Sequence, residues 1–399
     1  MLSEAVRPYI DASVPVLREH GLAITTHFYT SLFAAHPELK HIFNLGNQAN
    51  GAQQQSLASA VFAYAANYRN PDALAPVVER IVHKHASLGI TAEHYPIVGK
   101  HLLDAIQAVL GDAATPDLLA AWGEAYGVLA NVLIDAEKKL YAKAGVQAGE
   151  LQTLVVSDIR SESENVTSFY LQTADGKSPG VFHPGQYISV AVTIDGLRQL
   201  RQYSLSDAPE QPWWRISVKR ESENQPAGRI SNWLHDNLKV GATLQSSAAF
   251  GDFRPVIEGE NPIVLLSAGV GITPMISVLN TLAARNPHRR VLFAHAARHG
   301  RHHPLRNDVR AARSKLKALT EVQFYEMPEA ADQVGVDYQH EGRMALHCLN
   351  LEQVADAHIY LCGPGGFMRE QWRELIAAGV PPSRIHREVF GPDLLDHLI

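Results

Sequence analysis

The spacing of apolar residues changes twice along this chain of 399 residues. Up to about residue 143, apolar residues recur every three or four positions, which predicts amphipathic helices. From Leu151, short alternating runs are separated by Gly, Pro, Asp and Ser, which predicts an antiparallel barrel or sandwich. From Asn261, apolar strands alternate with helical stretches, the pattern of βαβ units and a parallel sheet. We therefore expect a multidomain protein with all-α, all-β and α/β parts in that order.

The composition favours a soluble globular protein, because 46% of residues are hydrophobic and 19% are charged. A net charge of −6 argues against nucleic acid as a partner. The two cysteines, Cys348 and Cys362, cannot form a disulfide framework, and the N-terminus lacks the apolar core of a signal peptide. The uncharged stretch 262–279 contains two glycines and Pro274, which predicts a strand, turn and helix rather than a membrane span. We expect a cytoplasmic protein without membrane insertion.

One of the 20 histidines stands out by its position. His85 follows Ile81 by four residues and precedes Leu88 by three, so it falls on the apolar face of a helix, whereas His83 does not. A neutral imidazole that points into an apolar slot can ligate haem iron. A lone histidine of this kind is more often a hydrogen-bonded core residue. Its position therefore makes His85 the candidate haem ligand, and the other histidines are expected to be surface or packing residues.

Glu137 places a carboxylate on a second apolar stripe. A buried carboxylate is costly unless it is paired, and Tyr95 and the second ring nitrogen of His85 are candidate partners. A carboxylate that accepts from a ligating imidazole makes that ligand more basic, which is peroxidase-like tuning. The other members of the stripe are Trp122, Tyr126, Ala130 and Leu133.

Two further polar residues lie on apolar helix faces. Tyr29 places a hydroxyl on a face shared with Leu22 and Phe33, and Gln53 heads a stripe with Leu57. Taken alone, each is better explained as a partly buried polar residue whose tip reaches water.

Residues 1–143 resemble the globin part of bacterial flavohaemoglobins. The resemblance lies in Phe28-Tyr29, in the run HPELKHIF that ends at Phe43, in Gln53 with Leu57, and in HKHASLGI around His85. It implies haem b, with His85 as the proximal ligand and with Tyr95 and Glu137 as its hydrogen-bonded relay. It further implies Tyr29 and Gln53 over the distal face, Leu57 closing the pocket and Phe43 packing on the porphyrin.

The β part contains short motifs suited to a flavin. Arg201-Gln202-Tyr203-Ser204 lies on an alternating strand, so that a cation, an aromatic ring and a hydroxyl can serve different subsites. Gly228 with Ser231 resembles a close-approach glycine followed by a capped helix start, which binds phosphate. A Greek-key barrel with unrelated turns is the alternative. Together the motifs resemble the ferredoxin-reductase flavin domain, which implies FAD held by Tyr187, Arg201, Gln202, Tyr203 and Ser204.

A glycine-bearing loop follows the apolar strand at 263–266, as in dinucleotide-binding sites. It resembles the same reductase family, which implies NAD(P)H. The implied nicotinamide-site residues are Ala268, Gly269, Val270, Gly271, Ile272, Thr273, Cys362, Gly363 and Pro364. Relatives often have Gly where Ala268 stands, and its methyl is tolerable if the backbone angle is ordinary. Cys362 lacks a nearby second cysteine, so we prefer a packing residue to a redox thiol.

The run Glu388-Val389-Phe390-Gly391-Pro392 matches the flavohaemoglobin C-terminal signature. By resemblance Phe390 covers the flavin ring, and Glu388 lies with Lys84 where the flavin and haem domains meet. Arginines 298, 301 and 306 could favour NADPH through its 2′-phosphate or could form a solvated face, so the choice stays open. The resemblance divides the chain into a globin at 1–147, an FAD-binding β-barrel at 151–258 and an NAD(P)H-binding α/β domain at 259–399.

The expected function is that of a nitric oxide dioxygenase, in which NADH or NADPH reduces FAD, electrons pass to haem, and O₂ and NO give nitrate. Such a division of labour explains three cofactor sites in one chain. Two alternatives remain: a haem-based sensor of O₂ or NO, and a flavohaem reductase of another acceptor. We expect a monomer with small-molecule partners only.

Overall fold

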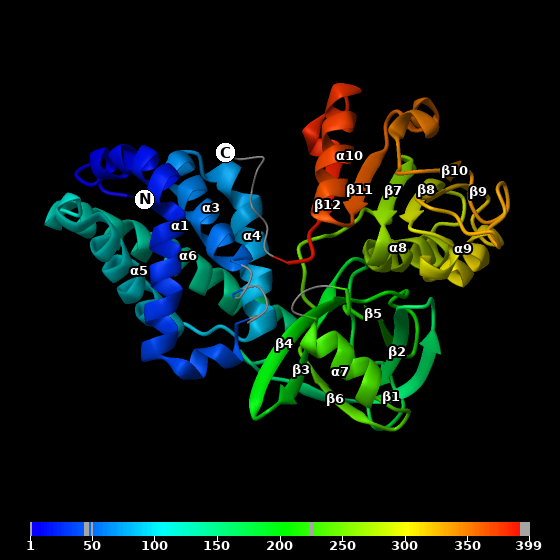
Figure 1. Cartoon of the computed structure of the whole chain (residues 1–399), viewed down its shortest axis with the longest axis horizontal. Helices are drawn as coiled ribbons and strands as arrows, with labels where there is room; N and C mark the ends of the chain where they lie inside the picture. The colour runs from blue at the N-terminus through cyan, green and yellow to red at the C-terminus, as the bar shows by residue number, and fades with distance from the viewer. Residues whose placement is uncertain (1, 44–47, 49–50, 224–226, 392–399) are drawn as a thin grey trace. The chain divides into compact units, whose positions relative to one another are not determined.

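The computed structural model describes residues 2–43, 48, 51–223 and 227–391 (Figure 1). The chain divides into two compact units, each described by itself below. The first comprises the described residues up to 151 together with 191–201 and Gly391, and the second comprises 152–190 and the described part of 202–390. The expected order of helical, antiparallel and parallel parts is confirmed.

The first unit is helical (Figure 1). Thr115 caps the last helix by accepting a hydrogen bond from the Leu118 N–H at 3.2 Å, and the helix ends before Gly145, which has a left-handed conformation. Its buried stripe contains Trp122, Ala130, Leu133 and Glu137. The helices are α1 (Arg7–Ala35), α3 (Ala52–Asn67), α4 (Pro71–Leu88), α5 (His94–Leu110) and α6 (Pro116–Ala144), with short 3₁₀ turns at Pro37–His41 and Gly111–Ala113.

Two details of the helical unit differ from expectation. The buried face of α1 includes Phe28, Tyr29 and Leu32, whereas Leu22 is 54% exposed, so Tyr29 does not share a buried face with Leu22. His83 is also buried, although its spacing placed it off the apolar face of α4. Both differences arise because a long helix packed on several neighbours buries more than one narrow stripe.

The antiparallel sheet has the strand order β4-β3-β6-β1-β2-β5. A β-bulge shifts the register of β1 against β2 between Val156 and Asp158, which adds local twist. One helix, α7 (Arg229–Asn237), belongs to the same part of the chain (Figure 1). The strands are β1 (Gln152–Ser161), β2 (Val166–Gln172), β3 (Tyr187–Ile194), β4 (Leu197–Ser204), β5 (Trp214–Lys219) and β6 (Thr243–Ser246).

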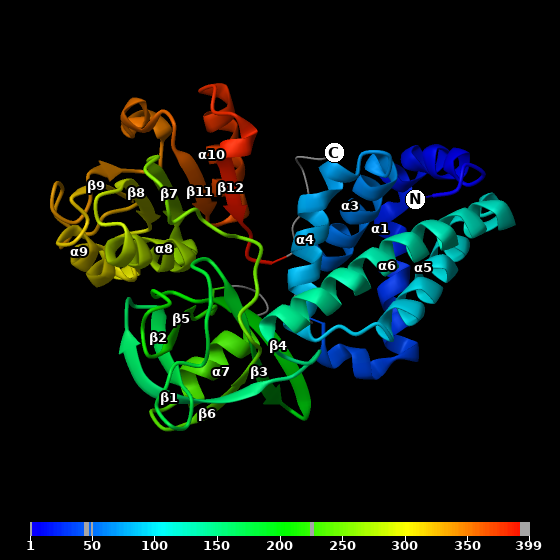
Figure 2. The same ribbon diagram turned by 180° about the vertical axis from the view of Figure 1, so that it is seen from behind.

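The second sheet has the order β10-β9-β8-β7-β11-β12, and its strands pair in parallel. Residues of α8 (Ile272–Arg285) and α9 (Arg306–Arg313) pack on one face, and residues of α10 (Gly365–Ala377) pack on the other (Figure 2). All of β7 is buried, as its unbroken apolar run predicts. The strands are β7 (Ile263–Ala268), β8 (Arg290–Ala297), β9 (Ala318–Tyr325), β10 (His340–Glu341), β11 (His358–Cys362) and β12 (Ile385–Glu388).

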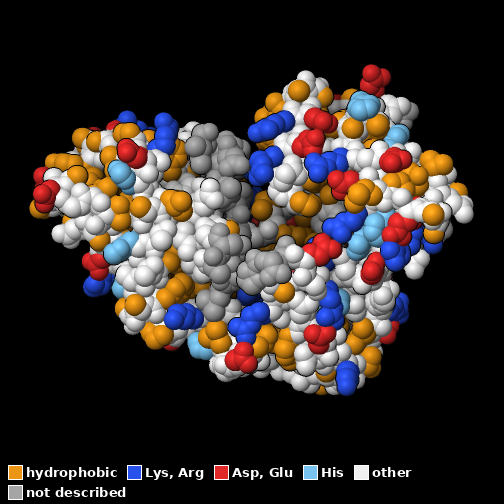
Figure 3. Space-filling view, in the orientation of Figure 1, with side chains coloured by type: hydrophobic (Ala, Val, Ile, Leu, Met, Phe, Trp, Pro, Cys, Tyr) orange, Lys and Arg blue, Asp and Glu red, His pale blue; other side chains and the backbone are white. Residues whose placement is uncertain are grey.

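Cations and anions are interspersed on the face shown in Figure 3, in keeping with the small net charge. Within the described part of the chain, α6 is one helix long and apolar enough to cross a membrane by length and composition alone. That is weak evidence, since α6 packs on α1, α4 and α5 and buries a carboxylate.

Candidate functional site

Three helices bring His85, Tyr95 and Glu137 together. The Nδ1 atom of His85 on α4 lies 2.8 Å from Glu137 Oε1 on α6 and 3.1 Å from the Tyr95 hydroxyl on α5. The Tyr95 hydroxyl donates to the same Glu137 oxygen at 2.5 Å. The three expected members of the relay are therefore in mutual contact.

The contacts define which imidazole nitrogen is available to a metal. Glu137 is buried and accepts hydrogen bonds, so His85 Nδ1 carries the proton and Nε2 is left as the ligating atom. The His85 side chain is 31% exposed, so the imidazole is not fully covered by other protein atoms. Burial, and then the hydrogen bond to Glu137, raise the pKa of Tyr95, so its hydroxyl remains a donor. This donor set fits haem iron.

Tyr126 supports the relay in a way the sequence did not reveal. Its hydroxyl donates to the Tyr95 carbonyl at 2.7 Å, and its ring lies against Gly99, where an added Cβ would be 2.5 Å from Cε1. Gly99 therefore lets α5 and α6 approach closely enough for Tyr95 to reach Glu137. The stripe on α6 included Tyr126, but nothing in its spacing indicated the backbone acceptor.

A second group of the expected haem-site residues gathers around Tyr29. Tyr29 is 6% exposed, its ring packs on Phe33 and Phe43, and its hydroxyl lies close to the side chains of Gln53 and Gln48. Burial raises the pKa of Tyr29 and keeps the hydroxyl protonated. The structure thus brings Tyr29, Gln53 and Phe43 together.

Leu57 and Gln48 also lie near Tyr29. Leu57 belongs to the same cluster and is partly buried. Gln48 could not be predicted from the sequence, because it does not belong to an apolar stripe and the spacing of residues therefore does not single it out. Its Oε1 accepts from Gln54 Nε2 at 3.1 Å.

The flavin motif on β4 leaves one buried atom unpaired. Ser204 is 6% exposed, and its hydroxyl has no hydrogen-bond partner among the described residues. An orphaned buried hydroxyl is costly and fits a site that a ligand completes. On the same strand Arg201 Nη1 donates to the Leu200 carbonyl at 2.8 Å, and Gln202 Nε2 donates to Ser189 Oγ at 3.4 Å.

Two more of the proposed flavin contacts, Tyr203 and Tyr187, take ordinary positions, whereas the expected helix cap does not form. Tyr203 is half-buried on β4, and Tyr187 is buried and pairs through its backbone with Phe250. The expected cap on α7 is wrong, because Gly228 precedes the helix with no side-chain cap. Ser231 Oγ instead donates to the Gly228 carbonyl at 3.2 Å, inside the first turn.

The nicotinamide loop runs from the end of β7 into α8. Gly269 has a φ of +54°, and an added Cβ at Gly271 would lie 2.4 Å from the Cys362 carbonyl oxygen. A Cβ at Gly363 would be 3.2 Å from the Ala268 methyl. Two chain segments thus form a narrow backbone cradle of the kind that accepts a dinucleotide. Ala268 has an ordinary φ of −136°, so its methyl is tolerated.

Other residues of this cradle are buried. Thr273 is 2% exposed and donates to the Val270 carbonyl at 3.0 Å, and Ile272 is fully buried at the start of α8. Cys362 is fully buried, and burial followed by the charge of Glu388 raises the pKa of its thiol well above the ordinary value. A protonated, buried thiol suits the predicted packing role. Pro364 immediately precedes α10.

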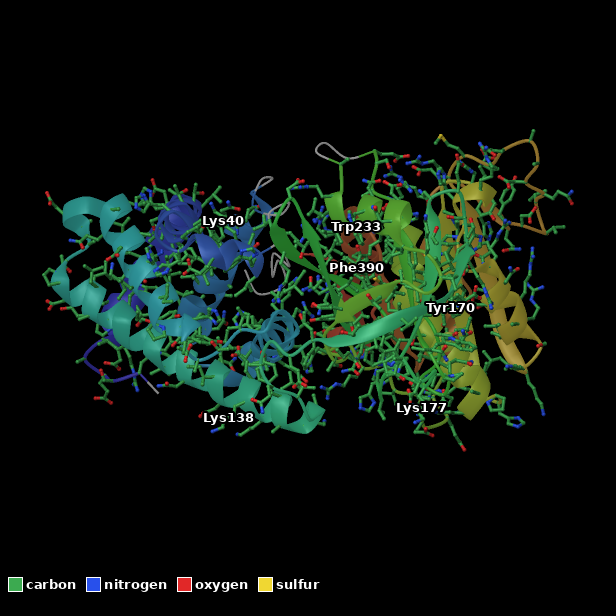
Figure 4. All side chains as sticks on the ribbon, turned by 90° about the horizontal axis from the view of Figure 1, so that it is seen from below. Lys40, Lys138, Tyr170, Lys177, Trp233 and Phe390 are labelled. Carbon is green, nitrogen blue, oxygen red and sulfur yellow. The ribbon has the colours of Figure 1, made fainter. Side chains whose placement is uncertain are left out.

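The C-terminal motif is described up to Gly391. Glu388 ends β12 and is 8% exposed, Val389 is half-buried and Phe390 is 43% exposed (Figure 4). Lys84 Nζ donates to the Gly391 carbonyl at 3.3 Å. Pro392 lies outside the described residues.

The arginines after β8 are paired with carboxylates. Arg298 makes two contacts of 3.0 Å with Glu223, and Arg301 contacts Glu329 at 2.8 and 2.6 Å. Nearby, the rings of His295 and His303 lie at an angle of 34° with centroids 4.7 Å apart, and burial lowers the pKa of His295 to about 3. Within the described ranges, no group of three or more His, Cys, Asp or Glu side chains is arranged to hold a metal ion.

Comparison with known proteins gives the same three parts. Family models match residues 26–133 (globin), 153–254 (oxidoreductase FAD-binding domain) and 265–372 (oxidoreductase NAD-binding domain). A flavohemoprotein from Bordetella parapertussis is 49% identical, covering 98% of this chain and 99% of that protein. One from Chromobacterium violaceum is 50% identical, covering 98% of each.

Two solved structures extend the comparison. A flavohemoglobin from Malassezia yamatoensis, solved with bound FAD and heme, is 31% identical with a TM-score of 0.87 and covers 98% of this chain and 100% of its own. The FAD/NAD-binding domain of a nitric oxide dioxygenase from Vibrio cholerae is 40% identical with a TM-score of 0.55, covering 60% of this chain and 99% of its own. The chain therefore belongs to the flavohemoprotein family.

Proposed function

We propose that the protein is a nitric oxide dioxygenase that converts NO and O₂ to nitrate with electrons from NADH or NADPH. The observation that carries the proposal is the contact of His85, Glu137 and Tyr95, which makes a basic metal ligand, in a chain that also holds a flavin motif and a nicotinamide cradle. The similarity to the Vibrio cholerae nitric oxide dioxygenase domain supports the same activity.

The residues of this chain would hold haem b, FAD and NAD(P)H. When bound, these groups supply hydride acceptance, electron transfer and oxygen binding. His85 Nε2 would ligate the iron, while Glu137 and Tyr95 hold the proton on Nδ1 and orient the ring. Tyr29, kept protonated by burial and oriented by Gln53, would donate to a distal ligand, with Leu57 limiting access and Phe43 packing on the porphyrin.

The reductase residues would position the two other groups. Arg201 and the start of α7 at Gly228 and Ser231 would take the flavin phosphates, and the Ser204 hydroxyl would bond the flavin ring. Tyr187, Gln202, Tyr203 and Phe390 would line the flavin, while the segments 268–273 and 362–364 would hold NAD(P)H. Glu388 and Lys84 would act between the flavin and haem.

The domain boundaries also belong to the proposed assignment. We place a globin at 1–147, an FAD domain at 151–258 and an NAD(P)H domain at 259–399. We further propose a monomer, and a reducing, cytoplasmic setting is supported by the two cysteines, both of which are free thiols.

Purified protein reconstituted with haem and FAD tests the activity. Since each NO and O₂ converted to nitrate takes up one electron, each NADH should support two conversions. We expect fast NO loss in air, slow loss without O₂, and nitrate as the product. The proposal is contradicted if aerobic NO loss is no faster than anaerobic loss, or if the number of NO molecules converted per NADH differs from two.

We expect Ser204→Ala to slow flavin reduction by NADH. The hydroxyl is buried and unpaired, so its loss removes one hydrogen bond to the ring at little cost to folding, and a loss of about 1 kcal/mol corresponds to roughly fivefold. Anaerobic stopped-flow flavin bleaching measures the rate. Ser246→Ala, which removes a buried barrel hydroxyl that already donates to the Ser247 carbonyl, is the control for stability. An unchanged rate in Ser204→Ala places the flavin elsewhere.

We expect NADH to be preferred over NADPH. Arg298 and Arg301 are already neutralised by Glu223 and Glu329, so a 2′-phosphate would meet carboxylates as well as cations. Glu223→Gln should lower the KM for NADPH severalfold and leave that for NADH unchanged. Glu321→Gln, which frees Arg313 elsewhere, should change neither. An equal KM for the two nucleotides in the unchanged protein contradicts this explanation.

A further inference from the structure

A buried polar network joins the antiparallel part to the parallel part within the second unit. Asn280 on α8 donates to Asp207 Oδ1 at 2.9 Å and to Asp308 Oδ1 at 2.8 Å. Asp207 follows β4, and Asp308 lies on α9. One amide group therefore holds two carboxylates that come from the two parts.

Arg215 on β5 completes the network. Its guanidinium is 4% exposed and binds Asp308 through two nitrogens, at 2.7 and 3.2 Å. It also donates to the Ser206 carbonyl, and it reaches the hydroxyl of Tyr170 at 3.5 Å (Tyr170 is labelled in Figure 4). The single guanidinium thus offsets one of the two buried carboxylate charges, and the neutral amide of Asn280 hydrogen-bonds both carboxylates.

The network lies next to both ends of the candidate hydride path. Asp207 is three residues after Ser204, and its carbonyl accepts from the Ser277 hydroxyl on α8 at 2.8 Å. Ser277 is five residues after Ile272, where α8 begins directly after the nicotinamide loop. At about 1.5 Å of rise per helical residue, the anchor is less than about 10 Å along the helix from that loop.

Close packing alone does not fix the two parts at this place. The network borders a cavity of about 380 Å³ that is also lined by Trp213 and Ala283. Where such a space separates two bodies, directional hydrogen bonds rather than apolar contact set their spacing. The carboxylates of Asp207 and Asp308 would repel each other without Asn280 between them.

We propose that Asn280 is a positioning residue for hydride transfer, which fixes the flavin strand end at Ser204–Asp207 against the nicotinamide loop through Asp207. The inference rests on the flavin and nicotinamide sites proposed above. Hydride transfer needs reacting atoms within about 3.5 Å, and a displacement near 1 Å can cost up to about a hundredfold in rate. Asn280 belongs to neither proposed site, so it would act only through this spacing.

The variant Asn280→Ala tests the proposal in the FAD-loaded protein. We expect anaerobic flavin reduction at saturating NADH to be 10- to 100-fold slower, with the Kd for NADH changed less than twofold. Amide hydrogen exchange should rise together at residues 204–207 and 269–272, a readout independent of activity. Removing Arg215 is less informative, because two buried carboxylates would lose their cation and the protein could unfold.

Arg285→Ala is the matched control. Arg285 lies on the same helix and makes an exposed ion pair with Glu210, so the variant removes another contact between the two parts without touching Asp207. We expect a rate change below twofold. An equal loss in both variants overturns the specific role of Asn280, as does an unchanged rate in Asn280→Ala while Ser204→Ala is slowed. An unchanged rate in both Asn280→Ala and Ser204→Ala overturns the flavin placement itself.

Discussion

Replacing His85 by alanine is expected to abolish stable haem binding and to lower aerobic NO consumption at least a hundredfold. The imidazole is held by Glu137 at 2.8 Å and by Tyr95 at 3.1 Å, so its removal deletes the iron ligand and leaves a buried carboxylate bonded only to Tyr95. The absorption spectrum and the haem content of the purified variant report the first effect. Flavin reduction by NADH should stay unchanged, since no residue of the flavin motif is altered.

Two comparison variants separate ligation from tuning. Glu137→Gln keeps the shape but weakens acceptance from His85, so we expect retained haem, a higher reduction potential and a rate about 10- to 100-fold lower. His20→Ala removes an exposed histidine of α1 and should behave like the unchanged protein. A His85→Ala protein that keeps its haem spectrum and its NO turnover would mean that another residue ligates the iron.

The relay was predictable because two of its members, Glu137 and His85, break a local rule. A carboxylate on an apolar stripe and an imidazole facing the same interior both require partners, and the structure supplies them. Tyr126 breaks no such rule. Its partner is a backbone carbonyl, a group that every residue carries, so spacing in the sequence cannot single it out.

The contacts of Asn280 were not predictable for a different reason. Asn280 is 73 positions from Asp207 and 28 positions from Asp308, and each is an ordinary polar residue by itself. Only the packing of α8 and α9 against the barrel brings them together. By contrast, the order of the two sheets follows from local periodicity, since strands buried on both faces read as continuous apolar runs and half-buried strands alternate.

The two glycines of the nicotinamide loop, Gly269 and Gly271, are required for different physical reasons. Glycines in the nicotinamide loop are expected to let phosphate approach the backbone. The structure separates their roles: Gly269 has a φ of +54° and nothing near its missing Cβ, whereas Gly271 faces the carbonyl of Cys362. Gly269 is needed for backbone conformation, and Gly271 is needed because the end of β11 lies against it.

Gly271→Ala is therefore expected to cost about 1–3 kcal/mol of unfolding free energy and to weaken NADH binding at least tenfold. The new methyl would lie 2.4 Å from the Cys362 carbonyl oxygen and 2.6 Å from the Gly363 N–H nitrogen, and backbone atoms cannot turn aside as a flexible side chain can. The two segments must separate, which widens the cradle on both sides of the nucleotide. Thermal unfolding and NADH titration measure the two effects.

Gly366→Ala provides the matched comparison in the same region. Gly366 lies in α10, and nothing stands within 4 Å of its added Cβ. Alanine in a helix should stabilise by about 0.4–1 kcal/mol, because the unfolded chain loses more freedom than the folded one. Opposite signs for the two glycines would establish that the cradle is set by the contact between Gly271 and Cys362. Equal changes in unfolding free energy for the two variants, or normal NADH binding in Gly271→Ala, would contradict this explanation. Either result would show that the Cys362 carbonyl can move away from the new methyl without cost.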